Sequence, residues 1–274
     1  MDHILSLSYG KDSMACLGAL DILGWPLTRI VTSDVWATDT IPAELPPMVA
    51  WKATADAIIK ERWGIKVEHV RGKYSYQDCF YMVCGAKSKY AGNIYGWPCQ
   101  RGPWCNSRLK QHVLGRNLQG CVQYLGIADD EPNRFHTLSE TKKIPLVELG
   151  WTEADCRRWC EENSLLSPLY TTETRGGCWF CHNQGVGQLR RLRKNYPGYW
   201  ALMLKWDADS LVTFKPGKCR RDGTYEPGHT IHDYDRRFAL EDQGIIIPDK
   251  PFRWELLDDN IQLYLEKEVR PCAG

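Results

Sequence analysis

Short apolar runs alternate with longer segments of helical periodicity along the first part of the chain. Strand-like runs are expected over residues 2–7, 29–35 and 65–70. Between them, residues 11–23 and 48–63 carry apolar side chains at helical spacing, and a glycine follows each segment. This strand–helix–strand–helix–strand order predicts a parallel sheet with right-handed crossovers.

The alternation continues toward the middle of the chain. A helix is expected over residues 107–118, and further strands are expected over residues 121–128 and 144–149. Thr152 is expected to cap the helix that follows it, with Asp155 three residues later in the reciprocal capping position. After that helix the pattern changes to a loop, a cysteine motif and further helices.

The change of pattern predicts the domain organisation. Residues 1–150 are expected to form an α/β core with a doubly wound, mostly parallel sheet, and residues 151–274 a mostly helical extension that carries the cysteine motif. A chain of 274 residues is long enough to bury a sizeable core. In the first helix, the residues expected to face inward are Met14, Leu17, Leu20 and Ile22.

Composition restricts the class of protein. The hydrophobic share of 43% and the charged share of 25% are ordinary for a globular protein. No apolar run reaches the length of a membrane-spanning helix, and the first residues lead straight into a strand-like run rather than a secretory signal. We therefore expect a cytoplasmic protein with no membrane partner.

The net charge of +1 hides an uneven distribution of charge. Residues 190–221 contain nine Lys or Arg and two Asp, whereas residues 241–268 contain eight acidic and three basic residues. A solvated helix face followed by an acidic tail explains this pattern as well as a surface for polyphosphate or nucleic acid does. Both interpretations stay open at this point.

The turn between the first strand and the first helix reads SYGKDS and begins at Ser8. In a parallel sheet such a turn lies at the carboxyl end of a strand, where ligands bind. Backbone N–H groups at a helix N-terminus attract anions, and Gly10 would let an oxyanion approach closely. Lys11 adds a charge, and Ser6, Ser8 and Ser13 add hydroxyl donors. The motifs of P-loop ATPases and of dinucleotide-binding folds are absent, so an ordinary tight turn is the alternative to an anion site.

Twelve cysteines are unusual for a chain expected in a reducing compartment, where structural disulfides are rare. Cys178 and Cys181 form a C-x-x-C motif after two glycines, a spacing that lets two thiolates face one metal. A dithiol redox pair is the alternative. Four other cysteines are expected to be buried as small hydrophobic residues: Cys16, Cys121, Cys156 and Cys160, the last two on one face of a helix that packs on the sheet.

The SYGKDS turn resembles the S-G-G-K-D-S pyrophosphate loop of the adenine-nucleotide α-hydrolase (PP-loop) superfamily. Within that superfamily the chain resembles the phosphoadenosine phosphosulfate (PAPS) reductase family, especially its phage and bacterial members of unassigned substrate. Three further stretches carry the resemblance: GWP at residues 96–98 with WCNSRLK at 104–110, GIADDEPNR at 126–134, and GGCWFC at 176–181. Together the motifs span residues 6 to about 184 in the order that the family shows.

The resemblance implies that ATP or a related adenine nucleotide lies over the turn, with Lys11 and the loop amides stabilising phosphate charge. The catalytic candidates are Lys11, Asp12 and Ser13. The nucleotide-binding candidates are Ser6, Ser8, Tyr9, Gly10, Lys11, Asp12, Ser13, Asp34, Arg108, Gly126 and Arg134. Mg²⁺ that bridges the phosphates would need one or two carboxylates, for which Asp129, Asp130 and Glu131 are the candidates.

The resemblance also implies that Cys105 joins Cys178 and Cys181 as a metal ligand. A [4Fe–4S] cluster is favoured, and zinc is the alternative. Cys99 is the nearest candidate for a fourth ligand, although the family does not support that position. An open fourth position would let the metal bind sulfide or substrate directly, whereas four thiolates would make a closed structural site.

Two departures from the family bear on function. Tyr9 replaces the second glycine of the loop, and the tail around Cys272 lacks the glycine and histidine that surround the catalytic cysteine of true reductases. The leading hypothesis is an enzyme that adenylates a substrate oxygen, releases pyrophosphate and transfers sulfur with the help of the metal site. Its acceptor would be a nucleic acid or a small molecule, and a homodimer is the one assembly that is kept open.

Two alternatives to this hypothesis are kept. The first is a sulfonucleotide reductase that releases sulfite from an adenylated sulfate and uses Cys272 as its reactive cysteine. The second is a non-catalytic nucleotide-binding module with a structural metal.

Overall fold

The computed structural model describes residues 1–88, 90–98, 103–134, 139–171, 176–215, 217–219, 225–226, 228–248 and 254. Cys99 and Cys272 lie outside the described residues. The chain divides into two compact units, one made of residues 1–82 and 101–181 and the other of residues 83–100 and 182–274. The C-x-x-C motif belongs to the same unit as the sheet, and the domain boundary expected at residue 150 stays a prediction.

A five-stranded parallel sheet forms the centre of the first unit, which confirms the α/β class expected from the sequence. Its strands are β1 (His3–Ser6), β2 (Arg29–Asp34), β3 (Val67–Arg71), β4 (Val122–Tyr124) and β5 (Lys142–Lys143). They lie in the order β3-β2-β1-β4-β5. The chain adds strands first on one side of β1 and then on the other, which places a topological switch point between β1 and β4.

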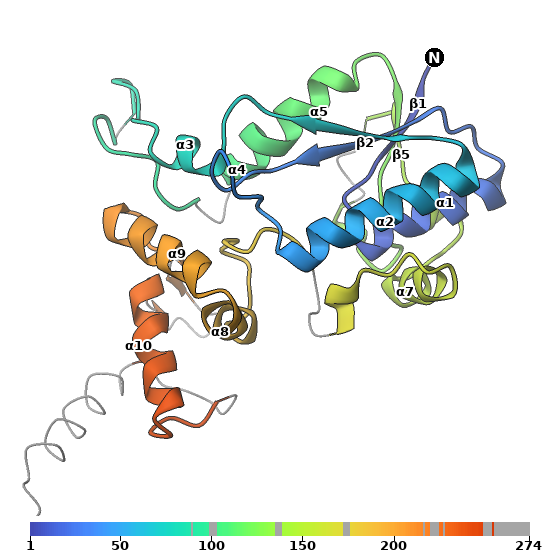
Figure 1. Cartoon of the computed structure of the whole chain (residues 1–274). Helices are drawn as coiled ribbons and strands as arrows, with labels where there is room; N and C mark the ends of the chain where they lie inside the picture. Colours follow the sequence, from blue (N-terminus) through green and yellow to red (C-terminus); the bar gives the residue numbers. More distant parts are fainter. Residues whose placement is uncertain are drawn as a thin grey trace, which may run out of the picture. The chain divides into compact units, whose positions relative to one another are not determined.

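Helices cover both faces of this sheet, with α1 and α2 on one face and α5 on the other (Figure 1). The helices of the unit are α1 (Lys11–Leu23), α2 (Pro46–Trp63), α3 (Tyr76–Phe80), α4 (Trp104–Asn106), α5 (His112–Asn117), α6 (Pro145–Glu148) and α7 (Glu153–Glu162). A single turn of π-helix, Ser107–Gln111, joins α4 to α5, and short 3₁₀ helices cover Pro132–Arg134 and Pro168–Thr171. No helix in the described part of the chain is long and apolar enough to span a bilayer.

The first helix, α1, has the bounds expected from the sequence. It ends at Gly24, whose φ of 62° lies in the left-handed region that glycine favours. Met14, Leu17 and Leu20 are at most 2% exposed, as expected, but Ile22 is 63% exposed. Ile22 follows Leu17 by five residues, or about 140° around the helix, so its side chain faces away from the core.

Two expected strands differ from the structure. The strand expected over residues 121–128 is limited to β4, and residues 144–149 form helix α6 rather than a strand. Pro145 is the first residue of α6, where the fixed φ of proline suits a helix and its missing N–H would have no partner in any case. The strand that pairs with β4 is β5, just before this helix.

Helix α7 begins with the expected capping box. The Thr152 N–H donates to Asp155 Oδ2 at 3.0 Å, and the Asp155 N–H donates to Thr152 Oγ1 at 3.3 Å. Cys156 and Cys160 are fully buried, but they pack on α1 and not on the sheet as expected. Cys121, which was also expected to be buried, is partly exposed because it lies in the bend before β4 and not in the strand; its thiol donates to the Gln119 carbonyl at 3.3 Å.

The second unit is mostly helical. It contains α8 (Val186–Asn195), α9 (Pro197–Asp209) and α10 (Ile231–Asp242), with the short antiparallel pair β6 (Lys218–Cys219) and β7 (Tyr225–Glu226). Aromatic side chains form much of its core. The Trp97 ring lies 4.8 Å from that of Phe214, and the indole N–H of Trp97 donates to the buried carboxylate of Asp207 at 2.9 Å.

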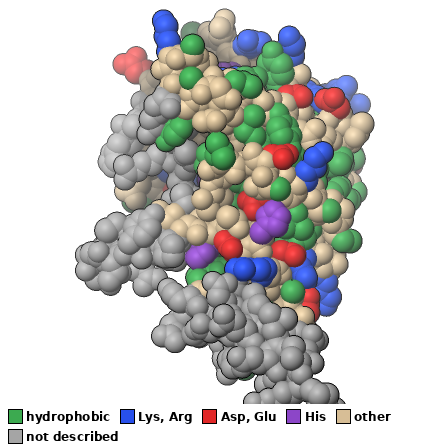
Figure 2. Space-filling model, turned by 90° about the vertical axis from the view of Figure 1, so that its left-hand side faces the viewer, with side chains coloured by type: hydrophobic (Ala, Val, Ile, Leu, Met, Phe, Trp, Pro, Cys, Tyr) green, Lys and Arg blue, Asp and Glu red, His purple; other side chains and the backbone are tan. Residues whose placement is uncertain are grey.

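Ion pairs within this unit neutralise part of the basic stretch at residues 190–221. Arg190 of α8 pairs with Glu241 of α10, and Arg193 pairs with Asp235 and Asp242 of the same helix. On the face of the molecule shown in Figure 2, basic and acidic side chains are interspersed among the coloured residues. These two arginines therefore act as partners of α10 rather than as free cations.

Candidate functional site

The SYGKDS turn lies at the carboxyl end of β1, where the chain enters α1. The segment that follows β4 packs directly against it, because a Cβ on Gly126 would lie 2.5 Å from the backbone nitrogen of Ser13. No real Cβ tolerates such a distance, so only glycine fits at this position. The structure therefore brings together the segments after β1 and β4 on either side of the switch point.

Hydroxyl groups organise the turn from inside. The Ser8 N–H donates to Ser13 Oγ at 3.1 Å, and the two serine hydroxyls are 3.0 Å apart. Gly10 is the N-cap of α1 in an extended conformation that any residue adopts, and a Cβ built there would meet nothing closer than 3.4 Å. Neither backbone conformation nor packing requires this glycine. The hydroxyls of Ser8 and Tyr170 lie nearest to that position, beside the first turn of α1, where backbone N–H groups and the helix dipole favour an anion.

Lys11 is held by carboxylates beside the turn. Its ammonium donates to Glu153 Oε2 at 2.7 Å and to Asp12 Oδ1 at 2.9 Å. Burial alone would lower the pKa of Lys11, but the hydrogen bonds to Glu153 and Asp12 raise it above its ordinary value. The backbone N–H of Lys11 donates to the Tyr170 hydroxyl at 3.2 Å. The turn therefore carries a permanent positive charge that has acidic partners.

Further carboxylates lie near the same turn. Burial raises the pKa of Asp12, Lys11 opposes this change, and the carboxylates of Glu153 and Glu131 reinforce it. Asp130 accepts the backbone N–H of Glu153 at 3.1 Å. Acidic groups from the segment after β4 and from α7 thus approach α1 together.

Arg134 is placed by one of these carboxylates. It pairs with Glu131 at 2.7 Å, three residues earlier in the chain, and about half of its side chain is exposed. A phosphate would therefore have to compete with Glu131 for this guanidinium.

Tyr9 takes a left-handed backbone conformation, with a φ of 57°. Its side chain is 1% exposed, and its hydroxyl donates to Asp56 Oδ1 at 2.5 Å and lies 3.2 Å from His69 Nε2. Burial, reinforced by the hydrogen bond to Asp56, raises the pKa of this phenol far above its ordinary value. Tyr9 is thus a neutral donor that links the turn to α2 and β3.

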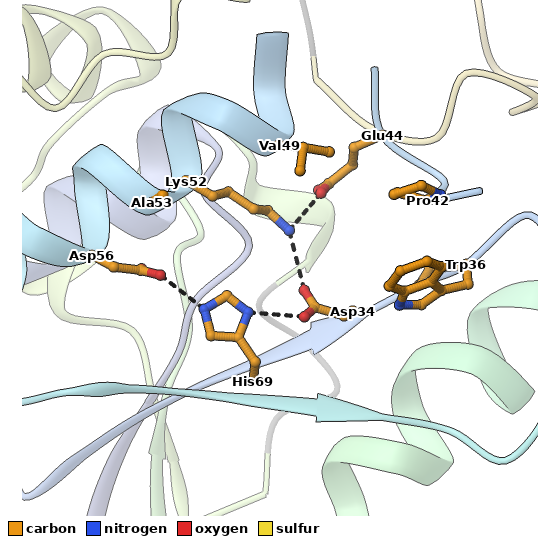
Figure 3. A pocket seen from close by; sticks show the side chains of 10 residues that line it. Asp34, Trp36, Pro42, Glu44, Val49, Lys52, Ala53, Asp56 and His69 are labelled. Carbon is orange, nitrogen blue, oxygen red and sulfur yellow. Dashed lines mark hydrogen bonds and ion pairs between the residues drawn. The ribbon is translucent and has the colours of Figure 1, made fainter. Parts of the chain in front are cut away.

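A pocket of about 230 Å³ lies at the carboxyl end of β2, lined by the partners of Tyr9 (Figure 3). His69 Nδ1 is 2.9 Å from Asp34 Oδ2, and His69 Nε2 is 2.9 Å from Asp56 Oδ2. The Lys52 ammonium pairs with Glu44 at 2.5 Å and with Asp34 at 3.4 Å. Trp36, Pro42 and Val49 supply the apolar part of the wall.

The protonation of His69 follows from its partners. Because ionised carboxylates only accept hydrogen bonds, both ring nitrogens are placed to donate, which requires the imidazolium form. Burial lowers the pKa of His69, but the hydrogen bonds to Asp56 and Asp34 raise it above its ordinary value overall. The pocket therefore places the His69 imidazole and the Lys52 ammonium among three carboxylates, those of Asp34, Glu44 and Asp56.

The remaining nucleotide-binding candidates have protein partners. The Ser6 hydroxyl accepts from the Gln123 amide at 2.7 Å and so links β1 to β4. Arg108 lies in the π-turn and donates to the sulfur of Met82 at 3.4 Å. Asp34 lines the pocket, as its place at the end of β2 suggests.

The three cysteines proposed as metal ligands, Cys105, Cys178 and Cys181, gather beside Lys110, and we call them the Lys110 thiol group. Burial raises the pKa of Cys178 to about 12. The ammonium of Lys110 opposes this rise, whereas the thiols of Cys105 and Cys181 reinforce it. Burial, together with Cys181, raises the pKa of Cys105 to about 11.

The C-x-x-C motif is fixed to the first unit by its central tryptophan. The Trp179 backbone N–H donates to Ala43 O at 2.8 Å, and its indole N–H donates to Pro42 O at 2.9 Å. Three thiols are a suitable donor set for iron–sulfur or zinc chemistry. Among the described residues, however, no three His, Cys, Asp or Glu side chains converge in metal-binding geometry.

Comparison with known proteins adds no family assignment. No protein-family model matches the chain, and no curated protein is significantly similar to it in sequence. The resemblance to the PAPS reductase family thus rests on the four motifs of this chain.

Several residues of the site were not predicted from the sequence: Lys52, Asp56, His69, Glu153 and Tyr170. Lys52 and Asp56 are four residues apart on α2 and hence on one face of it, which is a signal that the sequence contains. Glu153 and Tyr170 reach the turn only through the packing of α7 and the following 3₁₀ helix. No local sequence pattern predicts such long-range contacts.

Proposed function

We propose that the chain is a PAPS reductase-like PP-loop enzyme that binds ATP or a related adenine nucleotide and adenylates a substrate for sulfur transfer. The observation that supports this proposal is the place of the SYGKDS turn. It follows β1 at the switch point of an open parallel sheet, and Gly126 of the segment after β4 packs against it. Open parallel sheets bind ligands at such a crevice.

The phosphates would lie over the turn. The first-turn amides of α1 and the Lys11 ammonium would stabilise negative charge there, with the Ser8 hydroxyl beside them. Lys11 would exchange its bond to Glu153 for one to a phosphate oxygen. Mg²⁺ prefers oxygen ligands and is usually bound by one or two carboxylates together with phosphate oxygens, so one or two of the carboxylates near Lys11, Asp12 among them, would hold it there and it would neutralise phosphate charge.

The nucleoside would lie toward the pocket. The three carboxylates of this pocket disfavour a phosphate there, whereas they suit the amino and hydroxyl donors of a nucleoside. Trp36 offers an aromatic face at the same pocket. We therefore orient the nucleotide with its phosphates on the turn and its nucleoside near Asp34.

The chemistry would be transfer of an adenylyl group. A substrate oxygen would attack the α-phosphorus, a new O–P bond would form, and the bond to the β-phosphate would break with release of pyrophosphate. Lys11 and the loop amides would stabilise charge on the departing pyrophosphate. A metal bound by the Lys110 thiol group would supply or hold the sulfur.

ATP–pyrophosphate exchange tests this proposal. We expect the wild-type protein to catalyse exchange in the presence of its acceptor class, with nucleic acid and small oxygen nucleophiles supplied in parallel. Lys11→Ala should abolish exchange, whereas Lys66→Ala, which removes an exposed lysine of the same unit, should retain it.

Other outcomes would replace the proposal. ATP binding without exchange would indicate a non-catalytic module. Sulfite release from an adenylated sulfate, lost in Cys272→Ser, would indicate a reductase. Failure to bind any adenine nucleotide would remove the PP-loop assignment.

A further inference from the structure

The backbone of the SYGKDS turn depends on Tyr9. Among the described residues only Tyr9 and Ser164 have a positive φ without being glycine. A left-handed conformation is unfavourable for an L-residue with a Cβ, and it persists only where the surroundings determine it. Glycine would adopt the same φ of 57° freely. A tyrosine here therefore needs a compensating interaction.

That compensation comes from the buried side chain. The hydroxyl is bound by Asp56 of α2 and His69 of β3, and the ring contacts Trp51 edge-on with centroids 6.1 Å apart. The Lys52 ammonium lies 4.8 Å from the ring centroid. The tyrosine is thus fixed by two elements that are separate from the turn itself.

We propose that Tyr9 is a positioning residue whose buried hydroxyl, held by Asp56 and His69, fixes the SYGKDS turn in its phosphate-binding conformation. The inference rests on the proposed function for the identity of the ligand. A glycine in the same place would satisfy the backbone but would leave the turn without an anchor. With tyrosine, the backbone takes an unfavourable φ, but the bound hydroxyl holds the turn in one conformation.

The anchor also joins the turn to the pocket. Asp56 and His69 line the pocket, and the His69 ring links Asp56 to Asp34. A nucleoside that contacts these groups would change the hydrogen bonds that hold Tyr9. Binding at the two places would therefore be coupled, and the coupling would be reciprocal: a nucleoside that orders Asp56 and His69 around the Tyr9 hydroxyl would strengthen the binding of pyrophosphate, and pyrophosphate would strengthen that of adenosine.

Titration calorimetry with inorganic pyrophosphate tests the role of the hydroxyl. Tyr9→Phe should weaken binding about tenfold, the effect of losing one buried hydrogen bond to a charged group. Tyr9→Gly, which removes the unfavourable φ but also the anchor, should not restore affinity. Tyr124→Phe is the matched control: Tyr124 is equally buried, and its hydroxyl bonds to His3 and to Pro26 O, away from the turn. It should bind pyrophosphate like wild type.

Two measurements distinguish a role of Tyr9 in positioning the turn from a role in the general stability of the fold. Adenosine should increase the affinity of the wild-type protein for pyrophosphate about fivefold, and Tyr9→Phe should remove this increase. Without ligand, hydrogen exchange at the amides of residues 8–13 should be faster in Tyr9→Phe than in Tyr124→Phe. A variant that only lowers the overall free energy of unfolding would keep the effect of adenosine on pyrophosphate affinity. It would also not speed up exchange at residues 8–13 in particular.

The outcomes distinguish this inference from the proposed function. If wild type binds pyrophosphate, Lys11→Ala does not, and Tyr9→Phe binds like wild type with unchanged exchange, the role of Tyr9 is refuted while the proposed function stands. Full affinity in Tyr9→Gly would also refute it. If wild type binds neither ATP nor pyrophosphate, the proposed function fails and the ligand role of Tyr9 fails with it, while the exchange measurement still decides whether Tyr9 fixes the turn.

Discussion

Two groups of three cysteines lie in the first compact unit, and they differ in burial and in charged neighbours. Cys16, Cys156 and Cys160, which we call the buried thiol group, are fully buried where α1 packs on α7. The Lys110 thiol group is partly exposed and lies beside a lysine. Both groups contain enough sulfur for a metal, so the number of thiols does not distinguish them.

The environment does distinguish them, because only a thiolate ligates a metal well. In the buried thiol group, burial and then the Asp12 carboxylate raise the pKa of Cys160 to about 12, and the same two causes raise that of Cys156 further. A lysine opposes this effect in both groups, Lys11 at Cys156 and Cys160 and Lys110 at Cys178, whose pKa burial also raises to about 12. Solvent access is what differs. The buried thiol group therefore acts as apolar packing, whereas the partly exposed Lys110 thiol group can meet a metal ion and release its protons to solvent.

Loss of metal is the largest expected difference between the groups. Cys178→Ser should remove the iron or zinc that the proposed site binds, because it takes away one of three thiolate ligands. Cys156→Ser, the matched change in the buried thiol group, should leave the metal content unchanged. The measurement is metal per chain in anaerobically purified protein, together with visible absorption. Equal metal content in the two variants would contradict the comparison.

Alkylation of the metal-free native protein should show the next largest difference. The Lys110 thiol group should react with iodoacetamide at least about a hundredfold faster than the buried thiol group, which reacts only when the unit opens. Mass spectrometry of peptides after timed quenching measures each rate. Similar rates for Cys16 and Cys105 in folded protein would show that the burial of α1 against α7 is wrong.

The sequence predicted the elements that local patterns determine. Periodicity and Gly24 defined both ends of α1, and the reciprocal pair Thr152 and Asp155 located the start of α7. Pro145 begins a helix in a segment whose apolar residues were taken for a strand. A short apolar segment does not by itself distinguish strand from helix.

The site was predictable only where it is contiguous in the chain. The SYGKDS turn was found because its residues are neighbours, and Asp34 because it ends a strand. His69 and Asp56 belong to the site through the burial of Tyr9, which depends on how α2 and β3 pack. Cys156 and Cys160 were correctly expected to be buried, but their neighbour is α1, a pairing that periodicity cannot identify.

Stability should separate the groups by a smaller amount. Cys16→Ser places a hydroxyl in a fully apolar position and should lower the free energy of unfolding by about 1–3 kcal/mol. Cys105→Ser in metal-free protein should change it by about 0.5 kcal/mol or less, because that residue is partly exposed. Urea denaturation of the two variants measures both values. A reversed order would mean that the Lys110 thiol group supports the fold.

The smallest expected difference between the groups is in the dependence of stability on pH, because burial raises the pKa of thiols in both groups. Burial raises the pKa of Cys16 well above the ordinary value of 9.0, so above that pH the unfolded chain releases a proton that the folded chain keeps. Deprotonation then favours the unfolded state, and the free energy of unfolding should fall by about 1.4 kcal/mol per pH unit for each such thiol. Between pH 9 and the pKa of Cys16 in the folded state, Cys16→Ala should make the fall of the free energy of unfolding with pH less steep by about 1.4 kcal/mol per pH unit. This change of slope is expected whatever the effect of the substitution at neutral pH. Urea denaturation of metal-free protein across that range measures the slope, and an unchanged slope in Cys16→Ala would show that Cys16 is not held as a neutral thiol.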